Sequence, residues 1–230
     1  MIITGTLRRM LAAVESAERL AVRGLAQGTV ETEPTLTDRF LGALEQSISS
    51  DGLEIHGYRL SLRTLRDRGP DAPERRFGAD LVTVFELDTP RCRLRKGFLA
   101  QAKLAGQAEV QVDDSREYPV VSVRRSPNRR ERPSDLAPQC GQMLRVSPDS
   151  YVFVYSERSI SVIPANTVAH LVPDAERHAI YSIPVRQFFR GFFQSFIGDY
   201  RLSACDDQTL EDLRNQTLAN SAALLTLRAQ

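Results

Sequence analysis

The sequence has almost no net charge, because 30 basic residues are balanced by 29 acidic ones to leave +1. A global field that attracts polyanions is therefore absent, and any nucleic-acid contact must come from local patches. Cysteine is also scarce: only Cys92, Cys140 and Cys205 occur, far apart and odd in number. This argues against a disulfide framework and against a CxxC zinc site, and it favours a reducing cytosol.

Long apolar runs are missing as well. No stretch approaches the roughly 18 residues that a membrane-spanning helix needs. Arg8 and Arg9 precede an apolar segment, but Glu15 and Glu18 interrupt it, so the hydrophobic region of a signal peptide is lacking. We expect a cytoplasmic protein with no membrane partner.

Several common catalytic patterns are absent too. The three histidines, His56, His170 and His178, are isolated, and no Ser-His-Asp or Cys-His order stands out. Glycine-rich phosphate loops are not found either. These absences disfavour a serine-type hydrolase and a nucleotide-dependent kinase.

The patterns that are present indicate a mixture of helices and strands. Apolar residues at three- and four-residue spacing predict helices, and alternating or continuous apolar runs predict strands. Helices are expected near residues 10–25, 34–49, 136–144, 185–196 and 210–227, and strands near 58–62, 80–88, 97–104, 151–155 and 160–164. Residues 113–135 lack sustained periodicity and are expected to form a surface excursion. This order fits an α/β fold, a three-layer sandwich with a mixed central sheet flanked by helices.

Two of the predicted strands carry polar residues where they would meet. Asp80 heads one apolar run, and the next run ends in Gln101-Ala102-Lys103. Residues i and i+2 of a strand share a face, so Gln101 and Lys103 point to one side while Ala102 offers its backbone carbonyl. Oxygen ligands suit Mg²⁺, and a nearby ammonium group orients or activates a water molecule. The pattern predicts a magnesium site at this sheet edge.

Gly78-Ala79-Asp80, followed by Gln101-Ala102-Lys103, resembles the motif of the PD-(D/E)xK nuclease superfamily, in the Mrr-type variant with glutamine at the second acidic position. The resemblance implies a restriction-endonuclease-like core over about residues 34–165 of a single domain spanning 1–230, with a helical extension over 166–230. It implies that Glu45 and Asp80 bind Mg²⁺ (or Mn²⁺), that Gln101 replaces a metal-binding carboxylate and that Lys103 positions the water. The glutamine leaves the number of metal ions open.

Each of these residues also has an ordinary interpretation. Asp80 fits a turn before a strand, and Lys103 fits a solvated strand end. Glutamates are common on helices, so Glu45 has rivals nearby in Glu31, Glu33 and Glu54. Glu86 and Asp88 lie on the predicted Asp80 strand and are expected to be solvated charges at its far end.

Two segments rich in arginine and lysine, residues 91–96 and 124–132, are candidates for contact with phosphates. The residues expected to bind nucleic acid are Lys96, Arg124, Arg125, Arg129, Arg130 and Arg132. An equally good alternative is that these loops are solvated and paired with neighbouring acids. No helix-turn-helix or zinc-finger pattern supports reading of bases.

A cluster of phenylalanines follows helical spacing at residues 188, 189, 192, 193 and 196, and either packs in the core or meets a partner subunit. Taken with the resemblance, the sequence predicts a Mg²⁺-dependent DNA endonuclease in restriction or anti-phage defence. We expect a homodimer, acting with a further protein for target recognition or activation. The alternative is a non-catalytic nuclease-like module that binds nucleic acid or scaffolds a complex.

Overall fold

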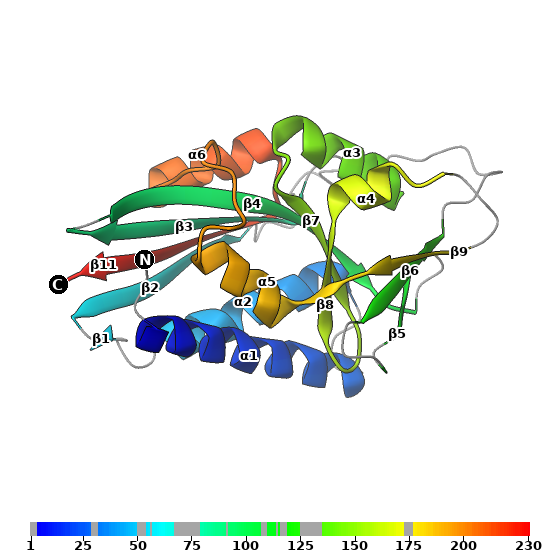
Figure 1. The fold of residues 1–230 in the computed structure, drawn as a ribbon, viewed down its shortest axis with the longest axis horizontal. Coiled ribbons are helices and arrows are strands. Elements are labelled where there is room, and N and C mark those ends of the chain that lie inside the picture. The colour runs from blue at the N-terminus through cyan, green and yellow to red at the C-terminus, as the bar shows by residue number, and fades with distance from the viewer. Residues whose placement is uncertain are drawn as a thin grey trace.

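A mixed eight-stranded sheet forms the centre of the protein (Figure 1). The computed structural model describes residues 4–28, 32–49, 54–55, 57–66, 79–90, 92–106, 110–113, 115, 119–124, 135–172 and 177–230. In spatial order the strands are β1 (Glu54–Ile55), β2 (Tyr58–Arg66), β11 (Ser221–Ala229), β3 (Leu81–Thr89), β4 (Cys92–Leu104), β7 (Ser150–Tyr155), β8 (Ile160–Pro164) and β10 (Ile183–Pro184).

Helices cover both faces of this sheet. One apolar core joins the sheet to α1 (Thr4–Ala26), α2 (Glu33–Ser49) and α5 (Val185–Phe193), and a second joins its other face to α3 (Leu136–Val146), α4 (Ala165–Ala169) and α6 (Asp207–Thr217). Strand β3 contributes Leu81 and Phe85 to the first core and Val82 and Val84 to the second. A continuous apolar run suits a strand buried on both faces. The predicted α/β class, with a mixed sheet between helices, is confirmed.

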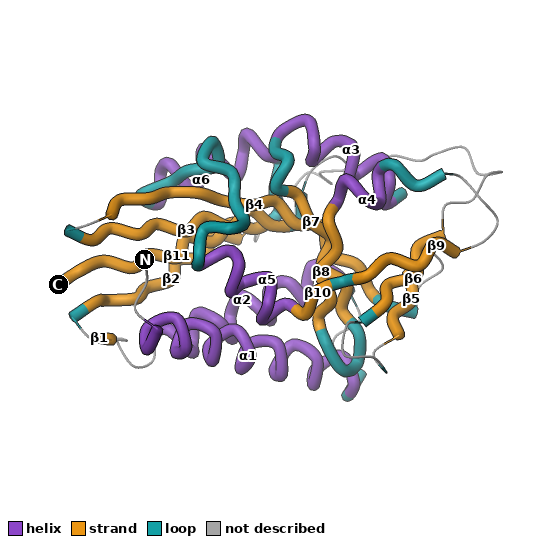
Figure 2. The backbone as a smooth tube through the Cα atoms, in the orientation of Figure 1, coloured by secondary structure: helices purple, strands orange, loops and turns teal. Residues whose placement is uncertain are grey.

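A second, smaller sheet stands beside the main one (Figure 2). It contains β5 (Val110–Asp113), β6 (Val120–Arg124) and β9 (Arg177–Tyr181), all antiparallel. Part of the segment expected to be a surface excursion is therefore a strand, because β6 is paired on both sides.

The helix predicted at 210–227 is wrong beyond Thr217, and the segment 166–230, predicted to be a helical extension, contains β9, β10 and β11 as well as helices. Helix α6 ends at Thr217, Leu218 adopts a left-handed conformation with φ 54°, and the chain then enters β11. Strand β11 lies between β2 and β3, antiparallel to the first and parallel to the second. Leucine and alanine favour helices in isolation, but burial on both faces of a central strand overrides that local preference.

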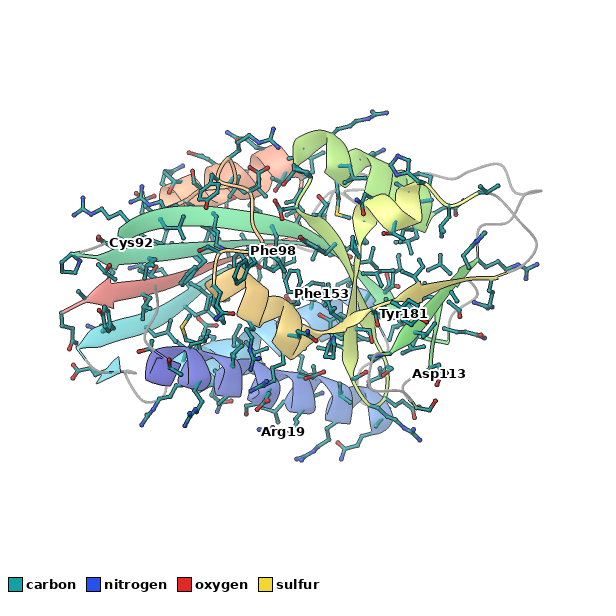
Figure 3. The ribbon with its side chains drawn as sticks, viewed as in Figure 1. Arg19, Cys92, Phe98, Asp113, Phe153 and Tyr181 are labelled. Atoms are coloured by element: carbon teal, nitrogen blue, oxygen red, sulfur yellow. The ribbon has the colours of Figure 1, made fainter. Side chains whose placement is uncertain are left out.

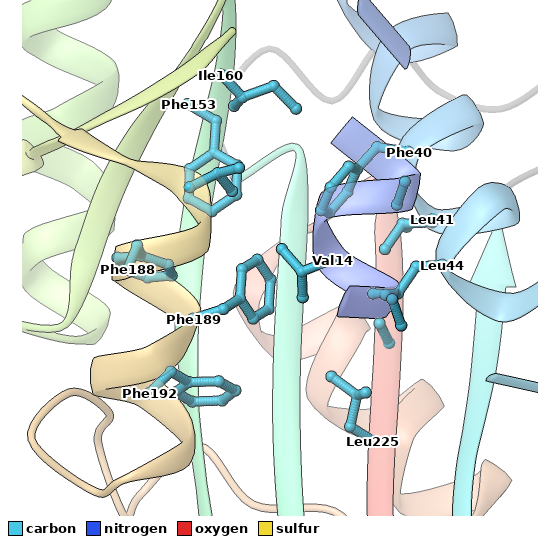
Figure 4. Packing of buried hydrophobic residues seen from close by; sticks show 14 of the residues in the cluster. Val14, Phe40, Leu41, Leu44, Phe153, Ile160, Phe188, Phe189, Phe192 and Leu225 are labelled. Carbon is cyan, nitrogen blue, oxygen red and sulfur yellow. The ribbon is translucent and has the colours of Figure 1, made fainter. Parts of the chain in front are cut away.

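The phenylalanine cluster belongs mainly to the core. Phe188, Phe189, Phe192 and Phe193 of α5 are all buried, and Phe188 and Phe192 each lie edge-on to Phe98, with ring centroids 4.9 Å apart. Phe189 also faces α2, where its ring centroid lies 6.1 Å from that of Phe40, and Figure 4 shows both rings in this core. The fifth ring, Phe196, follows the helix and is 83% exposed.

None of the helices in the described ranges combines the length and the hydrophobicity needed to cross a bilayer.

Candidate active site

Strand β4 continues past the start of β3, and this overhang creates the site. The β3–β4 pairing begins at Leu81 opposite Ala100, so residues 101–104 of β4 are paired with β7 alone. On the open edge, the Ala102 N–H donates to Asp80 Oδ2 at 2.8 Å and the Leu104 N–H donates to Glu33 Oε1 at 3.3 Å. Two carboxylates thus take the place of the missing strand.

Asp80 is held by three neutral donors. Besides Ala102, the Gln101 side-chain amide donates to Oδ2, and Asn220 Nδ2 donates to Oδ1 at 2.9 Å. Asn220 is nearby because β11 starts alongside β3, with the Ser221 N–H bonded to the Asp80 carbonyl at 2.9 Å. Sequence reasoning missed Asn220, since it lies 140 residues further along the chain and carries no local signal.

Lys103 forms an ion pair with Glu33. Its Nζ lies 3.2 Å from Glu33 Oε2, and the side chains are only 12% and 19% exposed. Glu33 is the first residue of α2. A carboxylate is favoured in the first turn because the N-terminus of a helix carries partial positive charge.

Burial raises the pKa of Asp80 to about 6, because the charged form loses its hydration. The Ala102 N–H and the Lys103 ammonium lower this pKa, while the negative charge of Glu33 raises it. The hydrogen bonds and the positive charge near Asp80 therefore do not compensate for the hydration that its carboxylate loses on burial. A bound cation would supply that charge.

Glu45, predicted to join Asp80, lies with a different set of residues. Its Oε2 accepts a hydrogen bond from Thr64 at 3.1 Å and lies 3.9 Å from Arg66 Nη2, both on β2. The glutamate of α2 that contacts the end of β4 is Glu33, one of the three rivals visible in the sequence. Glu33 is on the first turn of α2, and Glu45 is about three turns further along the same helix. The structure therefore places Glu33, and not Glu45 as expected, at the end of β4.

The oxygen atoms at this strand edge can supply part of the coordination of a hard divalent cation. Asp80 and Glu33 provide carboxylate oxygens, and the buried Gln101 Oε1 has no hydrogen-bond partner among the described residues. The Ala102 carbonyl points to the same strand edge as its N–H. No cluster of three acidic, histidine or cysteine side chains occurs within the described ranges, so water molecules or substrate oxygens would complete the coordination of Mg²⁺.

Of the residues predicted to bind nucleic acid, the described ranges include Lys96 and Arg124. Arg125, Arg129, Arg130 and Arg132 lie outside the described residues, while Arg124 is exposed at the end of β6.

The prediction for Lys96 is wrong, since its side chain is fully buried. Its ammonium donates to the carbonyls of Phe192 and Ile197 and lies 4.7 Å from the centre of the Phe192 ring. Burial lowers its pKa to about 8. Lys96 therefore binds the end of α5 and the loop after it, and it does not face an external phosphate.

Comparison of the chain with protein-family models, with curated protein sequences and with solved structures gave no match.

Proposed function

We propose that the protein is a Mg²⁺-dependent endonuclease that hydrolyses DNA phosphodiester bonds at the Asp80–Gln101–Lys103 edge of its sheet. The observation that carries the proposal is the buried Asp80 carboxylate, which stands beside a second carboxylate and next to an amide oxygen with no described partner. Such a group of oxygens, short of positive charge, favours a divalent cation.

In this proposal Asp80 and Glu33 hold the metal, and the Gln101 Oε1 and the Ala102 carbonyl complete the protein's share of the ligands. When bound, Mg²⁺ polarises the phosphodiester and lowers the pKa of a water ligand. Lys103 orients the attacking water and stabilises the negative charge that develops on the phosphate. Glu33 positions the Lys103 ammonium through their 3.2 Å ion pair.

We also propose that the fold is restriction-endonuclease-like. A mixed sheet between helices, with the acid and the Gln-x-Lys segment on adjacent strands, supports a restriction-endonuclease-like core. Strand β11 then completes that core from outside the 34–165 range expected from the motif. A cytoplasmic homodimer in restriction or anti-phage defence, with a further protein for recognition or activation, is the setting that we propose.

Nicking of supercoiled plasmid tests this function. With Mg²⁺ or Mn²⁺ we expect the parent protein to nick the plasmid, and Asp80→Asn and Lys103→Met to lose at least about a hundredfold in rate, since each removes a group that acts on the reacting phosphate. Glu45→Gln, on the same helix as Glu33, is the matched control and is expected to retain activity. A parent protein that leaves plasmid intact, or an active Asp80→Asn variant, would refute the proposal.

A second candidate is a nuclease-like module without catalysis. It is favoured by the contacts that already satisfy the site, namely the three hydrogen bonds to Asp80 and the Lys103–Glu33 ion pair. This alternative predicts DNA binding that is unchanged by Asp80→Asn and no cleavage with either metal ion. The nicking assay combined with a gel-shift assay separates the two functions.

A further inference from the structure

A band of arginines crosses the end of the sheet opposite to the Asp80 site. At this end β2, β11, β3 and β4 extend beyond α6 (Figure 1). The strand register places Arg59, Arg228, Asp88 and Arg93 side by side in one row across these four strands. The adjacent row on the same face contains Ser61, Thr226, Glu86 and Arg95. We call these eight residues the arginine face.

The buried carboxylate of Glu86 holds two arginines in place at the centre of the arginine face. Glu86 is 3% exposed, and its two oxygens contact Arg95 at 2.8 Å and Arg228 at 2.8 Å. The two arginine side chains remain about half exposed, at 49% and 51%. Each guanidinium carries five N–H donors, so one fixed carboxylate orients both groups and leaves donors free for a ligand.

The outer row remains open to solvent. Arg93 is 85% exposed while paired with Asp88 at 2.9 Å, and Arg59 is also exposed. Beside them lies a cleft of about 440 Å³, lined by Glu86, Leu87, Asp88, Arg93, Leu94 and Arg95. The arginine face has four arginines and two acids, a net charge of +2, in a chain whose total charge is +1. The arginine face thus carries a positive excess.

We infer that the arginine face is a second binding surface, one that holds the sugar-phosphate backbone of a nucleic acid. Each guanidinium group is planar and can donate two parallel hydrogen bonds, which matches the spacing of phosphate oxygens. Four neighbouring strands span roughly 14 Å, which equals the axial length of about four base pairs of a duplex.

The composition of the face favours a nucleic acid over a protein partner. Protein interfaces usually contain a desolvated aromatic or aliphatic anchor at their centre. The eight residues of the arginine face are all charged or hydroxyl-bearing. Such a surface binds by ion pairing and release of counterions, which together supply a large share of the affinity of proteins for nucleic acids.

The inference is tested by fluorescence anisotropy with a labelled duplex of about 20 base pairs, long enough to span the face. EDTA is present, so cleavage plays no part and the result does not depend on Asp80. The test variant combines Arg59→Gln with Arg93→Gln, which leaves Glu86 and its two arginines intact. The matched control combines Arg9→Gln with Arg19→Gln on the exposed side of α1, and Figure 3 shows Arg19 far from the strand end that carries Cys92.

We expect the test variant to lose about tenfold in affinity and its slope of log Kd against log salt to fall by about two, because two phosphate contacts are lost. The control is expected to bind like the parent, and all three proteins should unfold at the same urea concentration. Equal affinity in all three, an equal loss in both variants, or a parent protein that does not bind the duplex would overturn the inference. Competition by polyglutamate at the same charge concentration as DNA would also overturn it, in favour of an acidic protein partner.

Discussion

Asp80 directly precedes β3 and Glu86 lies on that strand, yet the two carboxylates are stabilised in opposite ways. Glu86 contacts two arginines, one on each neighbouring strand. Asp80 receives its hydrogen bonds from two amides and a backbone N–H, with a second carboxylate nearby. Glu86 therefore has two countercharges of its own, whereas the Lys103 ammonium near Asp80 is ion-paired with Glu33. We therefore interpret Glu86 as structural, and the cation-binding role of Asp80 remains our proposal.

The largest expected effect comes from removing the countercharge of Glu86. Combining Arg95→Met with Arg228→Met should destabilise the protein by about 3–5 kcal/mol at neutral pH, because a buried charge is left without a partner. Urea unfolding measures the loss. Glu86→Gln is the contrasting variant and should cost less, since the half-exposed arginines can turn to water. A greater loss in Glu86→Gln would contradict this assignment.

Asp80→Asn should act in the opposite direction and stabilise the protein by up to about 3 kcal/mol at pH 7. The pKa of Asp80 is raised to about 6 in the folded state. As the pH rises from about 4 to 6, the unfolded chain releases this proton before the folded protein does, so the parent loses stability over that interval. The gain of the variant should accordingly vanish below pH 4. A destabilised variant at pH 7 would show that the carboxylate is well accommodated.

Gln101→Glu adds a third acid beside Asp80 and Glu33. Without metal we expect a loss of about 1–2 kcal/mol from repulsion between like charges. With Mg²⁺ the thermal midpoint should rise by more than in the parent, because a carboxylate is a better ligand than an amide. Gln101→Met is the control and should weaken the response to Mg²⁺. An equal Mg²⁺ response in all three proteins would place the metal elsewhere.

The smallest effect is expected for Glu45→Gln. Its carboxylate is 39% exposed and lies 3.9 Å from Arg66, and surface ion pairs of this kind contribute about 1 kcal/mol or less. Thermal unfolding should therefore change little, whereas Glu33→Gln should reduce both stability and plasmid nicking. Equal effects of the two substitutions on nicking would undermine the choice of Glu33.

Local patterns were enough to predict much of the fold. The helices predicted near 10–25 and 34–49 match α1 and α2, and the strands predicted near 80–88, 97–104, 151–155 and 160–164 match β3, β4, β7 and β8. Strand β11 contains an Ala-Ala-Leu-Leu run, which by itself favours a helix. Only the neighbouring strands of the sheet make this segment a strand.

Local sequence patterns predict the proximity of Asp80, Gln101 and Lys103 but not the neighbours that come from distant parts of the chain. Asp80, Gln101 and Lys103 come together because adjacent strands of a hairpin share a register. Glu33 and Asn220 join them through the docking of α2 and the insertion of β11, and neither event can be read from nearby residues. Lys96 looked like part of a basic surface segment, but alternation along β4 turns it into the core.

Calorimetric titration with Mg²⁺ at pH 6, in two buffers with different ionisation enthalpies, shows whether Asp80 binds a cation. If it does, the parent should bind Mg²⁺ and release a fraction of a proton, since the cation lowers a pKa near 6. Asp80→Asn should show neither binding nor proton release. Equal Mg²⁺ binding by parent and variant, or no binding by the parent, would contradict the account.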